Sequence, residues 1–544
     1  MRLKSLVGIA VLAFAAPVHA QDRGAGPGGS EHGMPMPAAA ATDHDMTAMH
    51  AHDDTVAPKH PMLLTGYGSG GFAITTAVPQ AQAFFSNGME LGAAFAHPAA
   101  VAAMKEAVRL DPDCAMCKWG EALVDGPTIN FGKDAKERTS LYDLARTAQM
   151  QAAKNGTARE QALIAALVVR YRPGKPVEKR DIAYTKAMRA VQASYPEDNE
   201  IAVLTADAIL VTATHGDDPD MAQAQTAVDL LEPVLRRDPD HTPAIHFYIH
   251  ATEIVDHPRL AERYADRLAA LAPNASHLIH MPSHTFYWAG RYQDAADANR
   301  RAVEIGIEQA RMLGVDAPKG VWGLPYHAHN VVFGLGGALM SGDSRTALEL
   351  ARPLVETTQA MTEGDPVRQL LAASGYFALA RFDPAAALTT PEPKLPYLAA
   401  AWHYARGEAL AWSGDIAGAK AELAKIPDHI AKDKVPTETK AAKQMLAIAR
   451  GVLAGRIAMA EARPADAAKD FAAAADVEET KDFSRFSDPP AFWYPVRRDV
   501  AAALLAAGDA SGAVKAAQAS LTVRPRDPVA MDLLARSQAS LAAK

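Results

Sequence analysis

Segments rich in alanine alternate along the chain with short turns marked by Gly, Asp or Pro, and runs of β-branched residues are short. Alanine favours helices and lets them pack closely, so this pattern predicts an all-α fold. Tetratricopeptide units, each of which is a pair of helices, repeat with a period of about 34 residues. Pro239 and Pro273 are separated by one such period, and Ala261 and Ala295 hold the same small-residue position in two consecutive units.

The same turn recurs along the rest of the chain. Each turn residue is followed five positions later by an alanine: Asp256 by Ala261, Gly290 by Ala295, Gly342 by Ala347, Gly414 by Ala419, Ala462 by Ala467, and Gly508 by Ala513. Most intervals between these turns are longer than one period, and such units bury their apolar faces only by stacking. The prediction is an irregular tetratricopeptide-like αα-solenoid, a right-handed superhelix, over residues 63–544.

The amino-terminal residues predict export. Residues 1–20 combine two basic residues, an apolar stretch too short to cross a bilayer, and a small residue at Ala20, as in a cleavable signal peptide. No later run reaches the roughly 20 apolar residues of a transmembrane helix, so we expect a periplasmic or secreted protein without a membrane span. A net charge of -8 without a basic block argues against nucleic acid as a partner.

Residues 21–62 are predicted to form a disordered linker, because they offer little apolar surface to fold around. The linker is rich in histidine and methionine: His32, His44, His50, His52 and His60, with Met34, Met36, Met46, Met49 and Met62. Imidazole together with thioether sulfur suits copper. A solvated tail without any chemical role is the alternative.

Cys114 and Cys117 are the only cysteines of the chain. In an oxidising compartment, two cysteines three residues apart at a helix start lie close enough to join. We therefore predict a local disulfide. A redox-active pair and a metal site are the alternatives, and no thioredoxin-like βαβ pattern surrounds the motif.

Histidines are concentrated between residues 241 and 284. His246 and His280 are separated by one repeat period, as are His250 and His284, so both pairs hold equivalent positions in consecutive units. Residues four apart share a helix face, and neighbouring helices pack about 8–10 Å apart. These imidazoles, with Glu253 three residues beyond His250, are predicted to cluster in the concave groove. Zinc and copper accept such ligands, so the cluster is a candidate metal site.

Further residues are candidates for the same groove. His277 belongs to the same histidine-rich stretch, and a third inner helix is predicted to begin near His327 and His329. Asp207 falls at the corresponding position of the preceding inner helix. Arg497 could reach an anion in the groove, although a structural ion pair is the favoured interpretation.

Pro282 is expected to disturb this geometry. Proline lacks a backbone N–H and kinks or starts a helix, so His280 could lie on a loop and the cluster could be distorted. Two alternatives to a metal site stay open: a groove that binds a polar ligand, and structural histidines that hydrogen-bond to each other.

Four longer sequence motifs are specific enough to suggest a protein family. They are His246–Glu253 (HFYIHATE), His277–His284 (HLIHMPSH), Cys114–Gly120 (CAMCKWG) and Pro489–Arg497 (PPAFWYPVR). In these motifs the chain resembles a family of exported bacterial tetratricopeptide-repeat proteins, over nearly all residues after about 80. The resemblance implies the repeat fold. No activity is established for that family, so the resemblance implies no reaction.

Three functions follow from these patterns. The first is an exported protein that holds copper or zinc in the groove and handles the metal. The second is a scaffold whose groove binds a protein or peptide. The third is a metal-dependent enzyme in which Glu253 serves as base or ligand. No nucleophile elbow, Walker loop or His-Glu-x-x-His motif names a reaction, and no organic cofactor is predicted.

Overall fold

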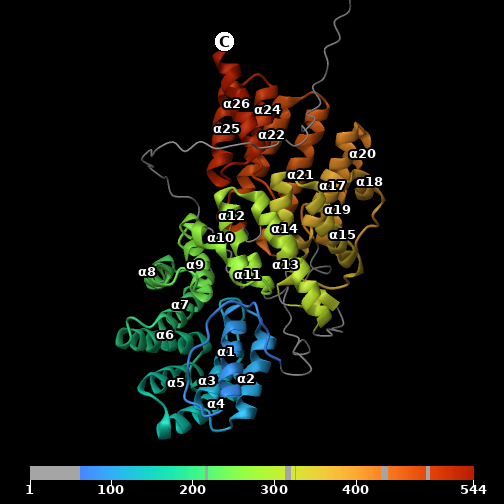
Figure 1. The fold of residues 1–544 in the computed structure, drawn as a ribbon. Helices are drawn as coiled ribbons and strands as arrows, with labels where there is room; N and C mark the ends of the chain where they lie inside the picture. Colours follow the sequence, from blue (N-terminus) through green and yellow to red (C-terminus); the bar gives the residue numbers. More distant parts are fainter. Residues whose placement is uncertain are drawn as a thin grey trace, which may run out of the picture. The chain divides into compact units, whose positions relative to one another are not determined.

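The computed structural model describes residues 62–214, 219–312, 320–324, 326–364, 366–430, 439–484 and 490–543. These residues are mostly helical and contain no extended β-strand (Figure 1). The predicted signal peptide and the histidine-rich linker, except Met62, lie outside the described residues.

The helices are, in chain order, α1 (Pro79–Ala93), α2 (His97–Leu110), α3 (Ala115–Val124), α4 (Ala135–Asn155), α5 (Ala158–Tyr171), α6 (Val177–Ser194), α7 (Asn199–Ala213), α8 (Met221–Arg237), α9 (Thr242–Ile254), the 3-10 helix η3 (Pro258–Ala261), α10 (Glu262–Leu271), α11 (Ser276–His280), α12 (Pro282–Ala289), α13 (Tyr292–Met312), the 3-10 helix η4 (Gly320–Gly323), α14 (His327–Ser341), α15 (Ser344–Ala360), α16 (Pro366–Ala372), α17 (Ser374–Phe382), α18 (Pro384–Thr389), α19 (Pro396–Ser413), α20 (Ile416–Leu423), α21 (Lys440–Ala460), α22 (Pro464–Glu478), α23 (Lys481–Ser484), α24 (Arg497–Ala506), α25 (Ala510–Val523) and α26 (Pro528–Ala542).

Consecutive helices pack as pairs, for example α1 on α2, α7 on α8, α13 on α14, α21 on α22 and α24 on α25. Each pair then contacts the next one along the chain, as α7 does with α9 and α22 with α24. This is the contact pattern of an αα-solenoid, in which each unit buries its apolar face against its neighbours. The predicted all-α solenoid is therefore confirmed.

The predicted turns have one backbone conformation in common. All six turn residues have positive φ: Asp256 62°, Gly290 78°, Gly342 80°, Gly414 85°, Ala462 58° and Gly508 85°. The alanine five residues after each turn is fully buried: Ala261, Ala295, Ala347, Ala419, Ala467 and Ala513. The left-handed turn ends the first helix, and the small side chain lets the second helix pack closely against it.

The same turn also joins α1 to α2, where sequence reasoning missed it. Phe95 has a φ of 54°, and Ala100, five residues later, is fully buried. An aromatic residue seldom adopts this conformation, since its Cβ meets the following carbonyl. Phe95 therefore gave no turn signal in the sequence.

Three long-range hydrogen bonds depart from strict neighbour packing. The segment before α1 runs along α9, where the Ser69 amide donates to Thr242 Oγ1 at 2.7 Å. Farther along, the Tyr287 hydroxyl of α12 donates to the Trp493 carbonyl at 3.2 Å, and the Tyr292 hydroxyl of α13 donates to the Pro525 carbonyl at 2.8 Å. The middle helices, which carry the histidines, are thus held by both earlier and later parts of the chain.

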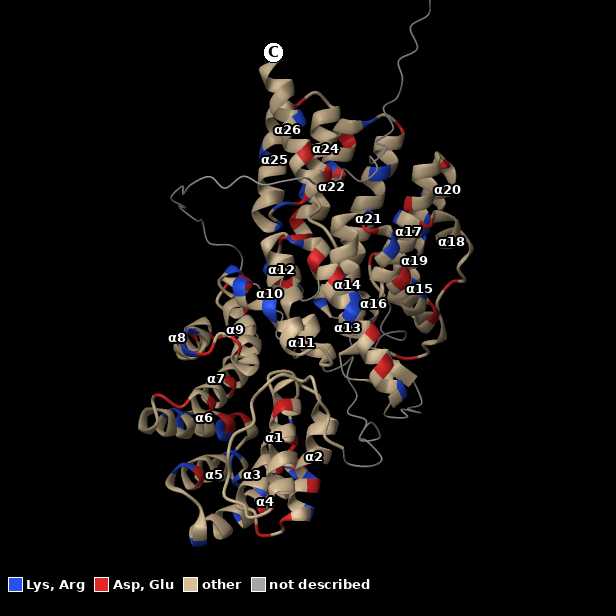
Figure 2. Ribbon diagram, in the orientation of Figure 1, with Lys and Arg blue, Asp and Glu red and all other residues tan. Residues whose placement is uncertain are grey.

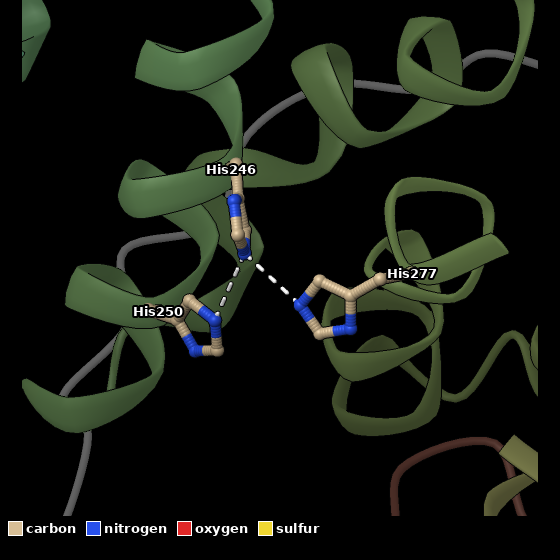
Figure 3. Close-up of side chains that lie close together, drawn as sticks. All are labelled: His246, His250 and His277. Atoms are coloured by element: carbon tan, nitrogen blue, oxygen red, sulfur yellow. Dashed lines mark hydrogen bonds between the residues drawn. The ribbon is translucent and has the colours of Figure 1, made fainter. Parts of the chain in front are cut away.

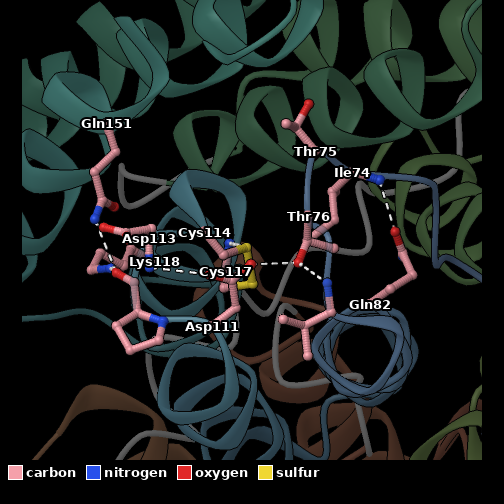
Figure 4. The surroundings of a disulfide bond; sticks show 12 residues. Ile74, Thr75, Thr76, Gln82, Asp111, Asp113, Cys114, Cys117, Lys118 and Gln151 are labelled. Atoms are coloured by element: carbon pink, nitrogen blue, oxygen red, sulfur yellow. Dashed lines mark hydrogen bonds between the residues drawn. A yellow bond between two sulfur atoms is a disulfide. The ribbon is translucent and has the colours of Figure 1, made fainter. Parts of the chain in front are cut away.

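A disulfide joins Cys114, the N-cap residue of α3, to Cys117 in the first turn of that helix (Figure 4). Their Cα atoms are 5.3 Å apart, and both side chains are buried. Trp119 of the same helix is buried and donates its indole N–H to the Leu163 carbonyl at 3.3 Å. The disulfide and this hydrogen bond fix the start of α3, and both sulfur atoms are occupied.

Charged residues of both signs are intermixed along the helices (Figure 2). Most of their ion pairs are solvent-exposed, such as Arg463 with Asp466 at 2.9 Å, and pairs of this kind stabilise a fold little. None of the described helices is long and apolar enough to cross a membrane.

Candidate metal centre

Six buried imidazoles meet where α9, α11, α12 and α14 come together. Each is at most 5% exposed, and each ring centroid lies 5.0 Å or less from that of another ring of the set. The six are His246 and His250 from α9, His277 and His280 from α11, His284 from α12, and His329 from α14. They divide into two triads, and the ligand atoms within each triad lie within 4.8 Å of one another.

The first triad is formed by His246, His250 and His277 (Figure 3). His246 Nε2 lies 3.2 Å from His250 Nε2 and 3.2 Å from His277 Nε2. On the other side of its ring, His246 Nδ1 lies 2.8 Å from the carbonyl oxygen of Ala93, the last residue of α1. A carbonyl only accepts, so Nδ1 carries the proton and Nε2 carries the lone pair. One in-plane lone pair thus faces two Nε2 atoms.

The second triad is formed by His280, His284 and His329. His280 Nε2 lies 2.9 Å from His284 Nε2 and 2.9 Å from His329 Nε2. Since His280 and His284 are four residues apart, their rings project from the same face of the helical stretch. His329 reaches the pair from α14.

Hydrogen bonds made by the Nδ1 atoms of two of these rings show which ring nitrogens carry protons. His284 Nδ1 donates to Glu253 Oε2 at 2.8 Å, and His280 Nδ1 donates to Asn299 Oδ1 at 2.6 Å. The Asn299 amide nitrogen donates to the Ala295 carbonyl at 2.8 Å, which leaves its oxygen toward His280. Both Nδ1 atoms therefore carry protons, and the Nε2 atoms of the two rings lie 2.9 Å apart.

Burial keeps four of the six imidazoles neutral near pH 7. It lowers the pKa of His246 to about 3, and it lowers the pKa of His250, His277 and His280 well below the ordinary value. Neutral imidazole nitrogens are the form that a transition metal takes as ligands, so these rings would be ready to hold zinc or copper.

Glu253 belongs to neither triad and lies behind a candidate ligand, so its role as a direct metal ligand stays a prediction. Its carboxylate accepts hydrogen bonds from His284 Nδ1 at 2.8 Å and from Trp288 Nε1 at 3.0 Å. Both oxygens are engaged with α12, on the far side of the His284 ring from His280. A carboxylate in this place fixes the tautomer and raises the basicity of the ligand nitrogen.

Pro282 leaves the cluster intact, so the expected distortion was wrong. Helix α11 ends at His280 and α12 begins at Pro282, while Met281 between them keeps helical dihedrals of φ -49° and ψ -38°. Proline is tolerated in the first turn of a helix, where its missing N–H would lack an intrahelical partner. His280 accordingly stays on a helix, in register with His284.

Asp207 and Arg497 belong to neither triad, and their place in the groove stays a prediction. Asp207 on α7 interacts electrostatically with Arg170, and burial raises its pKa to about 6. Arg497 forms an ion pair with Glu479 at 2.7 Å on the surface of α24, which agrees with the favoured interpretation of this residue as structural.

His327 lies beside the cluster without joining either triad. Its ring meets the edge of Trp322 at a centroid distance of 4.8 Å, and burial lowers its pKa to about 4. His277 and His329, named from the sequence only as groove candidates, contribute directly to the triads.

No protein-family model and no curated protein matches the sequence. Solved structures with some likeness include a chain of the APC/C hetero-tetramer Cut9–Hcn1, at 14% identity and a TM-score of 0.28, covering 84% of this chain and 76% of that one. Human IFIT1 in a dimer with m7Gppp-AAAA has 11% identity and a TM-score of 0.31, with coverages of 93% and 96%. Yeast Tom70 has 9% identity and a TM-score of 0.27, with coverages of 86% and 90%. Likenesses this low carry no argument about function.

Proposed function

We propose that this protein binds transition metal ions, copper or zinc, at its two histidine triads, and that it handles these metals as an exported protein. The observation that carries the proposal is the pair His280 and His284. Their Nε2 atoms are 2.9 Å apart although both Nδ1 atoms donate hydrogen bonds elsewhere. With His329 Nε2 also 2.9 Å from His280 Nε2, three buried imidazole nitrogens converge, which is a donor set that zinc and copper accept.

The donor set narrows the choice of metal. Each triad offers three imidazole nitrogens and no thiolate or carboxylate. Neutral imidazole suits zinc and copper, whereas magnesium and calcium prefer oxygen ligands. The two cysteines take no part, since they are joined to each other.

A metal-dependent enzyme is the second candidate. Three protein ligands leave a coordination position open, as catalytic zinc sites do, whereas structural zinc sites are closed by a fourth ligand. An open position would admit water or a substrate. The reaction is not identified by any residue near the triads.

Metal titration of the full-length protein tests the proposal. After treatment with a chelator, Zn(II) and Cu(II) are titrated by calorimetry, and retained metal is measured by elemental analysis after dialysis. We expect tight binding of one ion per triad, and weaker binding by the predicted linker, which must lose about 1–2 kcal/mol of backbone entropy for each residue it orders.

Paired variants assign the tight sites. His280→Ala with His284→Ala should abolish binding at the second triad, and His246→Ala with His250→Ala should abolish it at the first. His429→Ala is the matched control, because His429 is exposed and lies outside both triads. An unchanged tight class in both double variants would exclude the triads and favour a protein- or peptide-binding scaffold.

A further inference from the structure

A cavity of about 340 Å³ adjoins the first triad. It lies between the turn that joins α1 to α2, the helices α2, α11 and α13, and the start of α14, together with the segment before α1. His277 belongs to both features, since its ring lines the cavity and its Nε2 faces His246. The volume falls at the lower end of the range of small-molecule sites.

The cavity walls are uncharged. None of the residues that line it is Asp, Glu, Lys or Arg. Its two histidines, His277 and His327, are both buried. A charged ligand would lose its hydration here without gaining a counter-charge, so the cavity selects against ions.

Aromatic rings shape the wall next to the triad. Phe95 stacks on His277 at a centroid distance of 4.8 Å, and Tyr326 lies 4.3 Å from the same ring. Both residues have positive φ, 54° for Phe95 and 66° for Tyr326. Such conformations are unfavourable for bulky side chains, and they concentrate where a fixed side-chain position serves binding. Here they hold two rings against one histidine at the cavity wall.

The rim is apolar and accessible. Met62 and Met312 line the cavity, with exposed fractions of 52% and 72%. Methionine is flexible and polarisable, so it adapts to apolar ligands of different shapes. Tyr67 and Gln309 add a polar spot, where the Gln309 amide donates to the Tyr67 hydroxyl at 2.7 Å.

We propose that this cavity binds an uncharged small molecule with an aromatic body and at most one or two hydrogen-bonding groups. The site goes beyond the proposed metal binding and does not require a metal ion. Because His277 forms part of both, a bound molecule lies directly beside the first triad.

Binding of 4-methylphenol to the full-length protein tests the proposal, with 4-methylbenzoate and benzylamine as charged probes of similar size. Calorimetry or ligand-observed NMR gives the affinities at pH 7.5, in chelator-treated and in zinc-loaded protein. We expect 4-methylphenol to bind at least tenfold more tightly than either charged probe. Equal or tighter binding of a charged probe would overturn the proposal, as would no binding of 4-methylphenol to folded protein.

Substitutions at the cavity wall locate the bound probe. A Cβ added at Gly306 would meet His327 Nδ1 and Ser276 Oγ at 3.6 Å each, which is ordinary contact. Gly306→Ala should therefore keep 4-methylphenol binding within about twofold, whereas Gly306→Leu should fill the cavity and weaken binding at least tenfold. Ala99→Leu, on α2, fills the cavity from another wall and should act likewise.

The two proposals can fail separately. Unchanged binding of 4-methylphenol to both leucine variants would place the probe elsewhere and refute the cavity site. Binding that is lost in these variants, in a protein that retains no metal, would support the cavity site and refute the metal site.

Discussion

Acid should destabilise the metal-free protein through its buried histidines, and His246 offers the clearest test. Burial lowers the pKa of His246 to about 3, whereas an unfolded histidine has a pKa of about 6.5. Between these values the unfolded chain binds a proton that the native protein does not. The free energy of unfolding therefore falls as the pH falls below about 6.5.

The size of the effect follows from the same two pKa values. Between pH 7.5 and pH 5.5, one such histidine lowers the free energy of unfolding by about 1.4 kcal/mol. Carboxylic acids act in the opposite direction: burial raises the pKa of Glu478 to about 8 and that of Asp207 to about 6, so these groups stabilise the native state as the pH falls. When a His246 variant is compared with the parent protein, the contributions of these other groups to the pH dependence cancel.

Urea unfolding followed by circular dichroism, in the presence of a chelator, measures the effect. The change in unfolding free energy between pH 7.5 and pH 5.5 is compared for the parent protein and for His246→Gln. The variant should be less stable at pH 7.5 but should lose about 1.4 kcal/mol less on acidification. His429→Gln, an exposed control, should behave like the parent. Equal acid sensitivity of His246→Gln and the parent would show that His246 titrates normally and would refute the reasoning.

Other changes give further tests. Zinc should raise the melting temperature of the parent protein, by an amount that grows with zinc concentration. The double variant His280→Ala with His284→Ala should show a smaller rise. An equal rise in the double variant would place the stabilising ion elsewhere. Thiol labelling of the unreduced, unfolded protein should find no free thiol, because Cys114 and Cys117 are joined, and two labelled thiols would contradict this. Gly455→Ala should lower the free energy of unfolding by about 1–3 kcal/mol in urea melts, since its Cβ would lie 2.5 Å from the Phe471 ring. Gly342→Ala is the control for backbone strain, because its φ is 80° but no atom lies within 4 Å of the added Cβ.

The repeat architecture could be predicted because its signals are local. A left-handed turn selects Gly or a small polar residue, and close helix packing selects alanine five residues later, so both appear in the sequence. The turn at Phe95 could not be found in this way, because an aromatic residue holds the left-handed conformation there. Only the packing of its ring against His246 and His277 distinguishes it.

The histidine cluster was predicted in part for the same reason. Equal spacing by one repeat period placed the α9 and α11–α12 histidines on facing helices. The structure brings them together, with the ring centroids of His250 and His284 5.8 Å apart. The division into two triads depends on His329, which reaches the second triad from α14 across an irregular interval. Repeat counting could not fix its side-chain direction.

Side-chain direction could not be read from the sequence at other candidate residues either. Arg497 and Arg498 are adjacent, yet Arg497 forms a surface ion pair while Arg498 is buried against Asp527 at 3.0 Å, because a helix turns by about 100° per residue. The repeat count placed Asp207 on an inner helix but gave no sign of its interaction with Arg170.

The most direct test of the metal site is anomalous diffraction from crystals of zinc-loaded full-length protein, recorded at the zinc absorption edge. We expect an anomalous peak within about 2.0–2.1 Å of the Nε2 atoms of His280, His284 and His329, and a second peak among those of His246, His250 and His277. Crystals that contain zinc but show no peak at either triad would contradict the account.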